Sequence, residues 1–436
     1  MPRFYAAYVV SESSVHLELA KYNVKDIELG HSTRLRDRIL SLNCQESKTH
    51  LLTDQRLKNI DISLARPGEA KRIIHILDVI QPRAKSTDGE AAFPGLTGPV
   101  KVAGVGRTLV LDGAVVVTTG TLPAAEEAIM DMSGPMASLS KFSTMHQIVL
   151  LPTPAEGVDS VAFGQAIMEA GFKAAEYAAR AALGLRPDSF EVYDLSQTEN
   201  EARKEPPLPK VAYIYYLYSH GFGRERLFYG KSTKETLPTL IHPNEVLDSA
   251  IVHNGYTMPS KSVTYNHQNN QIVKDLYKRH HKDLIFKGII MVNHNAMYKD
   301  KEMSALMSAK LAKYLLKVDA AIISKDGGGQ ADVDIMLCCK RCESVGVKTV
   351  LLVKEEAGED GSGFCLADIA EEADAIVTTG NGTERMKIAA HIEEVVGGDD
   401  LYDGTGAKSF EINIPTNTIV GAVDFQGGIR MATMPY

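Results

Sequence analysis

After residue 270 the sequence alternates apolar runs with helical segments, and this alternation constrains the fold more than any other feature. Four apolar runs, "GIIMVN", "DAAIIS", "KTVLLV" and "DAIVTT", are separated by segments of helical character. The first two of these cover 301–317 and 331–346, and a third, shorter helix is expected around "LADIAEEA" at 366–373. Strands that alternate with helices of this length require crossover connections, which place the strands parallel. The pattern predicts a doubly wound α/β domain.

The first part of the chain has a different pattern. Residues 1 to about 120 consist of short β-branched runs separated by Gly, Pro and Asn, which predicts mostly β structure. The segment "GEAKRIIHILDVI" at 68–80 fits either a short helix or a buried strand. Between 156 and 184, alanines at helical spacing predict one long helix or two short ones. A charged, Pro-rich stretch at 199–210 predicts a loop or linker, and the runs after 408 are short β segments that can pair with the N-terminal half.

The predicted fold class is therefore α/β, with a β-rich N-terminal half that includes helices and a C-terminal doubly wound, mostly parallel α/β domain. The predicted boundaries are a β-rich domain at 1–155, a helix-plus-strand segment at 156–254 that continues the first half, and a C-terminal α/β domain at 255–436.

Composition excludes several classes of protein. The 55 acidic and 47 basic residues are mixed along the chain and give a net charge of −8, so the basic stripe needed for nucleic acid is missing. The longest apolar runs are too short to span a membrane, and the N-terminus lacks a secretory cleavage pattern. Five cysteines in a chain of 436 residues do not form a disulfide framework. We expect a protein of the reducing cytoplasm.

Two short motifs can be read in more than one way. In "SKDGGGQAD", Gly327, Gly328 and Gly329 lie between a predicted strand and a helix, where backbone N–H groups can approach an anion. A tight strand-to-helix turn is the favoured interpretation, because nearby aspartates would repel a phosphate. In "CCKRC" the three cysteines lie in mid-helix without a second matching pair, so buried apolar cysteine is favoured over a metal or redox site.

The densest run of hydrogen-bonding side chains lies just past the middle of the chain, in "SAIVHNGYTMPSKSVTYNHQNN" at 249–270. Loops that carry such groups often form sites. The predicted catalytic residues are His253, Asn254, Tyr256 and His267. The predicted ligand-binding residues are Gln268 in this segment, Asn293 at a strand end, and the three glycines at 327–329. No metal site is predicted.

Longer stretches carry a resemblance to a known family. They include "GRTLVLDGAVVVTTG", "LIHPNEVLDSAIV", "TYNHQNNQIVKDLYKRH" and "VDAAIISKDGGGQADVDIMLCCKRCESVGVKTVL". Over nearly its whole length the chain resembles the proprotein that supplies the alpha and beta subunits of component B of glycine, sarcosine and betaine reductases, which is related to the proline reductase proprotein. In that family the precursor cuts itself before a cysteine, and the new N-terminus becomes a pyruvoyl group.

This sequence departs from the family at the cleavage position. The self-cleavage requires a side-chain thiol or hydroxyl that attacks the preceding carbonyl and is then eliminated, but the matching residue is Gly255, which has no Cβ. Hydroxyls at Thr257, Ser260 and Ser262 are displaced from the expected position but are alternative nucleophiles for processing. The central segment is therefore predicted to be an uncut remnant of a self-processing loop.

The resemblance implies a subunit of a reductase complex that cleaves C–N bonds together with a selenoprotein or thiol partner. We expect this chain to be uncleaved and to carry no cofactor, with a pyruvoyl group present only if a shifted residue is processed. The expected ligand is a small-molecule amine or a related compound, and the expected assembly is an oligomer. Two alternatives stay open: a non-catalytic scaffold that binds the selenoprotein subunit, and a self-processing pyruvoyl enzyme that uses a shifted Ser or Thr.

Overall fold

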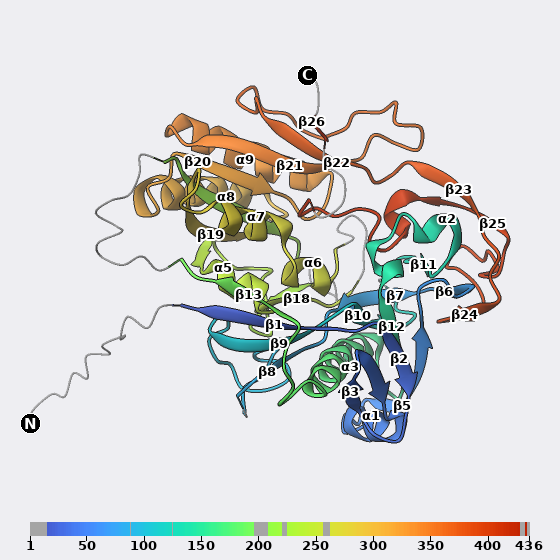
Figure 1. The fold of residues 1–436 in the computed structure, drawn as a ribbon. Coiled ribbons are helices and arrows are strands. Elements are labelled where there is room, and N and C mark those ends of the chain that lie inside the picture. The colour runs from blue at the N-terminus through green and yellow to red at the C-terminus, as the bar shows by residue number, and fades with distance from the viewer. Residues whose placement is uncertain are drawn as a thin grey trace, which may run out of the picture.

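Several small sheets form the N-terminal half of the molecule, and one larger sheet dominates the C-terminal half (Figure 1). The computed structural model describes residues 15–87, 89–123, 125–195, 208–219, 225–255, 262–427 and 432–433. Of the helices in these ranges, none is long and apolar enough to cross a membrane.

Two four-stranded sheets organise the N-terminal half. One has the order β13 (Ser189–Tyr193), β1 (Leu17–Asn23), β9 (Gly106–Asp112) and β8 (Arg83–Lys85); the other has the order β5 (Leu57–Ala65), β12 (His146–Pro154), β10 (Ala114–Thr119) and β7 (Ile76–Ile80). Helix α3 (Ser160–Arg180) packs against both sheets through its alanine-rich face. The Asp159 side chain caps this helix by accepting hydrogen bonds from the amides of Val161 and Ala162. The predicted helical region is thus one long helix.

The open question at 68–80 is settled in favour of strands. The segment forms β6 (Lys71–Ile73) and β7, and every residue of β7 is buried. Strand β6 lies between β11 (Met130–Asp131) and β24 (Glu394–Val396), so a C-terminal segment joins an N-terminal sheet. The other small sheets consist of β2 (Asp26–Leu29), β4 (Ile39–Leu42) and β3 (Arg34–Arg36); β16 (Lys231–Ser232), β15 (Arg226–Phe228) and β18 (Ile251–His253); and β23 (Arg385–Ala389) with β25 (Glu411–Pro415).

The larger sheet has seven strands, and its five central strands are parallel. Its order is β17 (Thr239–Ile241), β19 (Ile285–Asn293), β14 (Lys210–Leu217), β20 (Ala320–Ser324), β21 (Lys348–Glu355), β22 (Ile376–Asn381) and β26 (Ala432–Thr433). The α/β fold class, with its mostly parallel C-terminal sheet, is confirmed. Strands β14 and β17 lie within 156–254 but pair with strands of the last part of the chain; the domain boundaries stay a prediction.

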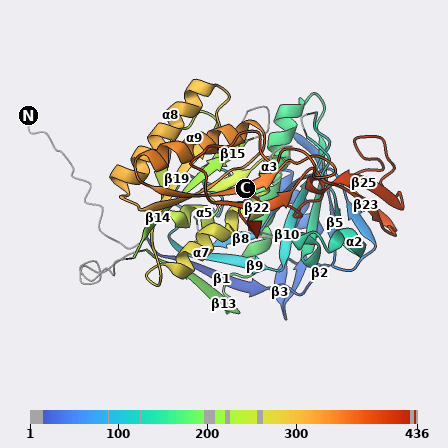
Figure 2. The ribbon, with the colours of Figure 1, turned by 90° about the horizontal axis from the view of Figure 1, so that it is seen from above.

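Different elements cover the two faces of this sheet. One face packs against α8 (Tyr298–Lys310), which continues as a π-helical turn (Leu311–Leu315), and against α9 (Gln330–Ser344). The three cysteines of α9 are fully buried there, as predicted. The other face packs against α5 (Pro243–Leu247), α7 (Gln271–Arg279) and residues of β1 and β9. Figure 2 shows α8 and α9 on one side of the sheet and β1 and β13 beyond the other.

The short helix expected at 366–373 is wrong, because this segment is irregular in the structure. Two of its backbone amides donate to side chains of α9 instead of forming helical bonds. The amide of Ala367 donates to Asp332 Oδ2 at 2.7 Å, and that of Ala370 donates to Met336 Sδ at 3.4 Å. Tertiary contacts therefore override the local helical preference.

Candidate functional site

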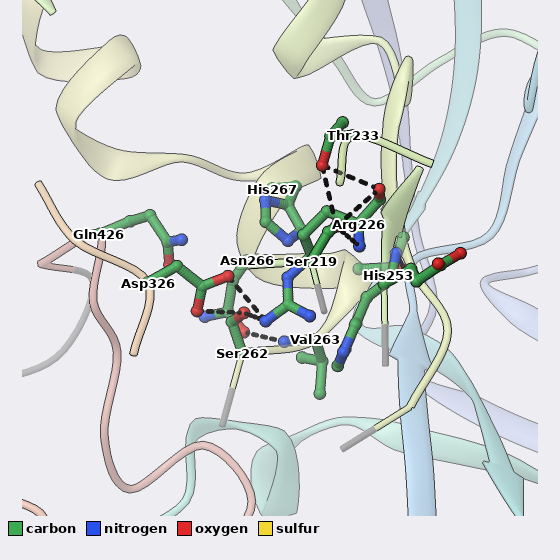
Figure 3. A network of polar contacts seen from close by, with 12 residues as sticks. Ser219, Arg226, Thr233, His253, Ser262, Val263, Asn266, His267, Asp326 and Gln426 are labelled. Atoms are coloured by element: carbon green, nitrogen blue, oxygen red, sulfur yellow. Dashed lines mark hydrogen bonds and ion pairs between the residues drawn. The ribbon is translucent and has the colours of Figure 1, made fainter. Parts of the chain in front are cut away.

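The candidate site lies at the carboxyl ends of β14 and β20, where ligands bind in open α/β sheets. Asp326 follows β20, Arg226 comes from β15, and His253 comes from the end of β18. Ser262 and His267 belong to the segment that leads into and forms α6 (Thr264–Gln268). Figure 3 shows the Arg226 side chain in the middle of this cluster. Four separate parts of the chain converge on this site.

A buried ion pair forms the centre of the cluster. Arg226 Nη2 lies 2.7 Å from Asp326 Oδ2, and both side chains are fully buried. The hydroxyl of Ser262 accepts a hydrogen bond from Arg226 Nη2 at 2.8 Å and donates to Asp326 Oδ1 at 3.1 Å. Charges removed from water are tolerated only when they are paired and hydrogen-bonded in this way.

Ser219 fixes the backbone of Arg226. The Arg226 amide donates to Ser219 Oγ at 2.7 Å, and this hydroxyl lies 3.1 Å from the Arg226 carbonyl oxygen and 2.9 Å from Thr233 Oγ1. Because Ser219 follows β14, these contacts attach β15 to the carboxyl edge of the seven-stranded sheet.

His267 takes part in a buried chain of hydrogen bonds. Its Nδ1 lies 2.5 Å from the hydroxyl of Tyr215 on β14, and that hydroxyl accepts from Gln426 Nε2 at 3.0 Å. Burial raises the pKa of Tyr215 well above 10, so the phenol keeps its proton. Burial, and then the charge of Arg226, lower the pKa of His267 to about 3, so the imidazole is neutral. With the phenol donating to Nδ1, the ring proton is on Nε2, which has no hydrogen-bond partner among the described residues.

His253 is fully buried beside this chain. Burial, followed by the charge of Arg226 and the proximity of the second imidazole, His267, lowers its pKa well below 6.5, so it is also neutral. Its amide donates to Thr264 Oγ1 at 2.9 Å, and the Thr264 hydroxyl and amide both donate to Asp78 of β7. Burial raises the pKa of Asp78 to about 7. Two uncharged imidazoles thus lie near one buried guanidinium, a combination suited to binding an anionic or strongly polar group.

The other predicted residues have different surroundings. Asn254 Oδ1 accepts from the amide of Glu225, which joins the strand ends before β15 and after β18. The Gln268 side chain is bound to Gln81 and Ser249, so it connects α6 to the N-terminal half. The Asn293 side chain bonds to the backbone at Ser219, Lys234 and His294. Tyr256, Thr257 and Ser260 lie outside the described residues. Of the predicted residues, His253, His267 and Ser262 come together with Arg226.

The three glycines form the turn between β20 and α9. Gly327 has φ +117° and faces the ring of Tyr218, and Gly329 has φ +61° immediately before α9. A Cβ on Gly328 would lie 2.1 Å from Glu356 Oε1. Asp332 in the first turn of α9 is paired with the buried Lys325. This geometry favours the interpretation as a tight turn, and ligand binding by the glycines stays a prediction.

A second polar group, not predicted from the sequence as a site, lies at the end of β19. His294 Nδ1 is 3.2 Å from Asp334 Oδ2, and the same carboxylate pairs with Lys301. His294 stacks on Tyr216 with ring centroids 4.9 Å apart. It lines a cavity of about 250 Å³ with Ser219 and Asn295. The place of His294 directly after a predicted strand was the available signal, and Asp334 follows the glycine motif in "SKDGGGQADVD". Arg226 and Gln426 lie in segments without a recognisable motif.

The described residues offer no group of three or more His, Cys, Asp or Glu side chains that could hold a metal ion. A pyruvoyl group does not fit residue 255, because a glycine has no β-heteroatom from which to make one. Gly255 also has φ +155°, a conformation that other residues rarely adopt.

The fold and site define an α/β protein with a buried polar centre at the carboxyl edge of a mostly parallel sheet. Residues 15–426 match the family described as glycine/sarcosine/betaine reductase component B subunits. The chain belongs to this family.

Curated relatives agree with this assignment. The chain is 39% identical to the sarcosine reductase complex component B subunit alpha of Peptoclostridium acidaminophilum, over 84% of this chain and 86% of that protein. It is 37% identical to the glycine reductase complex component B subunits alpha and beta of Acetoanaerobium sticklandii, over 97% of this chain and all of that protein. Identity to the betaine reductase complex component B subunit alpha of P. acidaminophilum is 33%, over 85% of this chain and 86% of that protein. No solved structure matches.

Proposed function

We propose that this chain acts as a component B subunit of a glycine-, sarcosine- or betaine-type reductase complex without being cut and without forming a pyruvoyl group. The observation that carries the proposal is the absence of cysteine between Cys44 and Cys338, with glycine at position 255. A chain that keeps the family fold but lacks the β-heteroatom cannot make the electrophilic ketone at the family position.

The substrate class follows from the missing ketone. A pyruvoyl carbonyl captures a primary or secondary amine as a Schiff base, and that route is closed here. We therefore propose a substrate that has no N–H to condense, bound at the Arg226 cluster. The neutral Nε2–H of His267 and the buried guanidinium beside it are suited to hold an anionic group of such a molecule. A thiol- or selenol-bearing component would supply the nucleophile that breaks the C–N bond, and we propose that the complex is cytoplasmic and oligomeric.

Intact-mass measurement of the purified protein under denaturing conditions tests this proposal directly. We expect one species near 47.5 kDa. Treatment with borohydride and a labelled primary amine should leave the chain unlabelled. Two fragments whose junction falls in the central segment, with a keto-acyl N-terminus on the second, would overturn the proposal.

One observation supports a second candidate, self-processing before Ser262. The Ser262 hydroxyl donates to the Asp326 carboxylate, an arrangement that can remove the proton from an attacking oxygen. In this reaction Ser262 Oγ attacks the Lys261 carbonyl and forms an ester. Elimination releases the Lys261 carboxylate, and hydrolysis of the resulting dehydroalanine releases ammonia and leaves a pyruvoyl group. Two fragments from the wild-type chain and one from Ser262→Ala would favour this candidate.

Turnover by a reconstituted reductase complex distinguishes a catalytic subunit from a non-catalytic scaffold. If His267 contacts the substrate, His267→Asn should lower turnover by about a hundredfold, while His281→Asn, at an exposed histidine remote from the site, should leave it unchanged. Unfolding by urea shows whether the His267 variant is folded under the assay conditions. Normal turnover by a folded His267→Asn protein would favour the scaffold.

A further inference from the structure

One sheet of the N-terminal half ends in an unpaired edge. Strand β13 is the terminal strand of its four-stranded sheet and pairs with β1 on its inner side. Within the described ranges no other strand pairs with its outer side, which lies at the rim of the molecule in Figure 2. The carbonyl of Tyr193 at its end accepts from Asn244 Nδ2 at 3.2 Å, so the available edge covers 189–192. Backbone N–H and C=O groups of a terminal strand face outward and can bind a further strand.

The side chains along this edge are apolar and exposed. Phe190 is 49% exposed and Val192 is 54% exposed. Phe190 lies opposite the buried Ala20 of β1, so both side chains point to the face of the sheet that α3 covers. Leu183 and Leu185, which follow α3, are 39% and 43% exposed. Terminal strands are usually protected by Lys, Pro or a bulge, and β13 has none of these.

The carboxylates next to this edge are compensated within the chain. Glu191 is the acidic residue of β13, and it points to the opposite face because side chains alternate along a strand. Its Oε1 lies 2.5 Å from Lys21 Nζ, and its Oε2 lies 3.3 Å from Lys274 Nζ. Glu18 of β1 pairs with Arg107 at 2.7 Å. The net charge of −8 disfavours contact between two copies through unbalanced surfaces, but these carboxylates add no uncompensated charge to the edge.

An identical edge is complementary to this one. In an antiparallel pair with a two-fold axis through Glu191, Phe190 lies opposite Val192 of the partner subunit, and Val192 lies opposite Phe190 of the partner subunit. A cross-strand pair of an aromatic and a β-branched side chain is favourable. The two Glu191 carboxylates stay on the other face, each between the lysines of its own chain.

We propose that β13 pairs antiparallel with β13 of a second copy of this chain, so that two four-stranded sheets join into one sheet of eight strands. The contact lies outside the Arg226 cluster, so the pairing does not depend on the reaction that the proposed function assigns to that cluster.

Sedimentation velocity of the full-length chain over a range of concentrations tests the pairing. We expect a species of twice 47.5 kDa, about 95 kDa, whose share increases with concentration. Val192→Lys places a charge on the pairing edge and should raise the dissociation constant of the dimer by about tenfold. Val102→Lys, at a valine that is 68% exposed in a loop, is the matched control and should leave the dimer unchanged. Urea unfolding shows that both variants are folded.

A cross-link tests the register. In the proposed pair the two Cα atoms of residue 191 lie about 4.5–5.5 Å apart, a distance that a disulfide spans. Oxidised Glu191→Cys should therefore migrate as a dimer on a denaturing gel without reductant, whereas the oxidised wild type, with its five cysteines, should migrate as a monomer.

Three results would each overturn the proposal: a wild-type chain that is monomeric at every concentration, an unchanged dissociation constant in Val192→Lys, or no cross-link in Glu191→Cys. None of them changes the denatured mass of the wild-type chain, which tests the proposed function, so the two failures are distinguishable.

Discussion

The molecule buries charge in two regions, and it does so in different ways. In the N-terminal half, Arg72 uses Nε and Nη2 to bind Asp131 and Nη1 to bind the carbonyl of Ala407. At the carboxyl edge of the larger sheet, Arg226 and Asp326 are equally buried, but the side chains there include His267 beside this pair and His294 in the second polar group at the end of β19. In each of these rings Nε2 has no hydrogen-bond partner among the described residues.

This difference distinguishes a structural ion pair, here called a brace, from a candidate ligand-binding site. Arg72 connects strands β6 and β11 to a C-terminal loop, and all three of its nitrogens are engaged by the protein itself. Buried polar groups are normally satisfied in this way, so unsatisfied ones need an explanation. A ligand that completes the hydrogen bonds of the histidines is the explanation we favour for the carboxyl edge.

The largest effect is expected where the brace is broken. Arg72→Met leaves the buried Asp131 carboxylate without its partner, so the free energy of unfolding should fall by about 3–5 kcal/mol in urea titrations. Turnover per folded molecule should not change. Arg107→Met, which removes a half-exposed pair with Glu18, is the matched control and should cost less than about 1 kcal/mol.

A change at the carboxyl edge should lower turnover more than it lowers stability. Asp326→Asn keeps the size of the side chain but removes the charge that faces Arg226, and should lower the free energy of unfolding by about 1–3 kcal/mol. Turnover of the reconstituted complex should fall at least tenfold, as measured by steady-state kinetics. If turnover stays normal in this variant, the Arg226–Asp326 pair is another brace and the comparison fails.

The glycine turn next to Asp326 allows a test with smaller expected losses of stability, in which two adjacent glycines are compared. Gly327→Ala introduces a Cβ at φ +117° and 2.9 Å from the Tyr218 ring, so we expect a loss of stability of about 1–3 kcal/mol. Gly328→Ala is not at a positive φ, and its Cβ meets the carboxylate of Glu356, which pairs with Lys354; because the end of this flexible side chain can move aside, the variant should cost less. Equal losses in thermal unfolding would show that φ is not the controlling factor.

The pH dependence of stability should have opposite signs in the two regions. His267 has a folded pKa of about 3, below its ordinary 6.5, so the unfolded state binds more protons and stability is lost as pH falls through this window. Asp78 has a folded pKa of about 7, above its ordinary 3.8, so its contribution is lost as pH rises from about 4 to 7.

Two variants isolate these contributions. Relative to the wild type, His267→Gln should lose less stability on acidification from pH 6 to pH 4, and Asp78→Asn should lose more, each by up to about 1.4 kcal/mol per pH unit. Urea titrations at pH 4, 5 and 6 measure both. Parallel pH profiles for all three proteins would contradict the assignment of these shifts.

Periodicity predicted the parts of the fold that are determined locally. The alternation after residue 270 gave the parallel strands, and the alanine spacing gave α3, because each pattern reflects which face of an element is buried. The segment at 68–80 was undecided because a short apolar run suits a buried strand or a helix equally well. The expected helix at 366–373 failed because contacts to Asp332 and Met336 of α9 take its backbone amides.

The site was predictable only in part. His253, His267 and Ser262 lie within 15 residues of one another in an unusual polar segment, which drew attention to them. Arg226 lies in "GFGRERLFYG", and Asp326 follows β20, one hundred positions later. No local sequence motif spans such a distance, so the sequence gives no sign that the two side chains form a pair. Only the pairing of β14 with β20 and of β15 with β18 brings these side chains to the same place.

The position of β14 has a consequence for how this architecture responds to a break in the chain. Strand β14 comes from before the central segment but lies between β19 and β20, which come from after it, and β17 pairs with the outer edge of β19. If the backbone were severed between residues 255 and 262, the two pieces would remain interleaved within a single hydrogen-bonded layer. They would travel together through any separation that preserves the fold, and only a denaturant would reveal that the molecule had become two polypeptides.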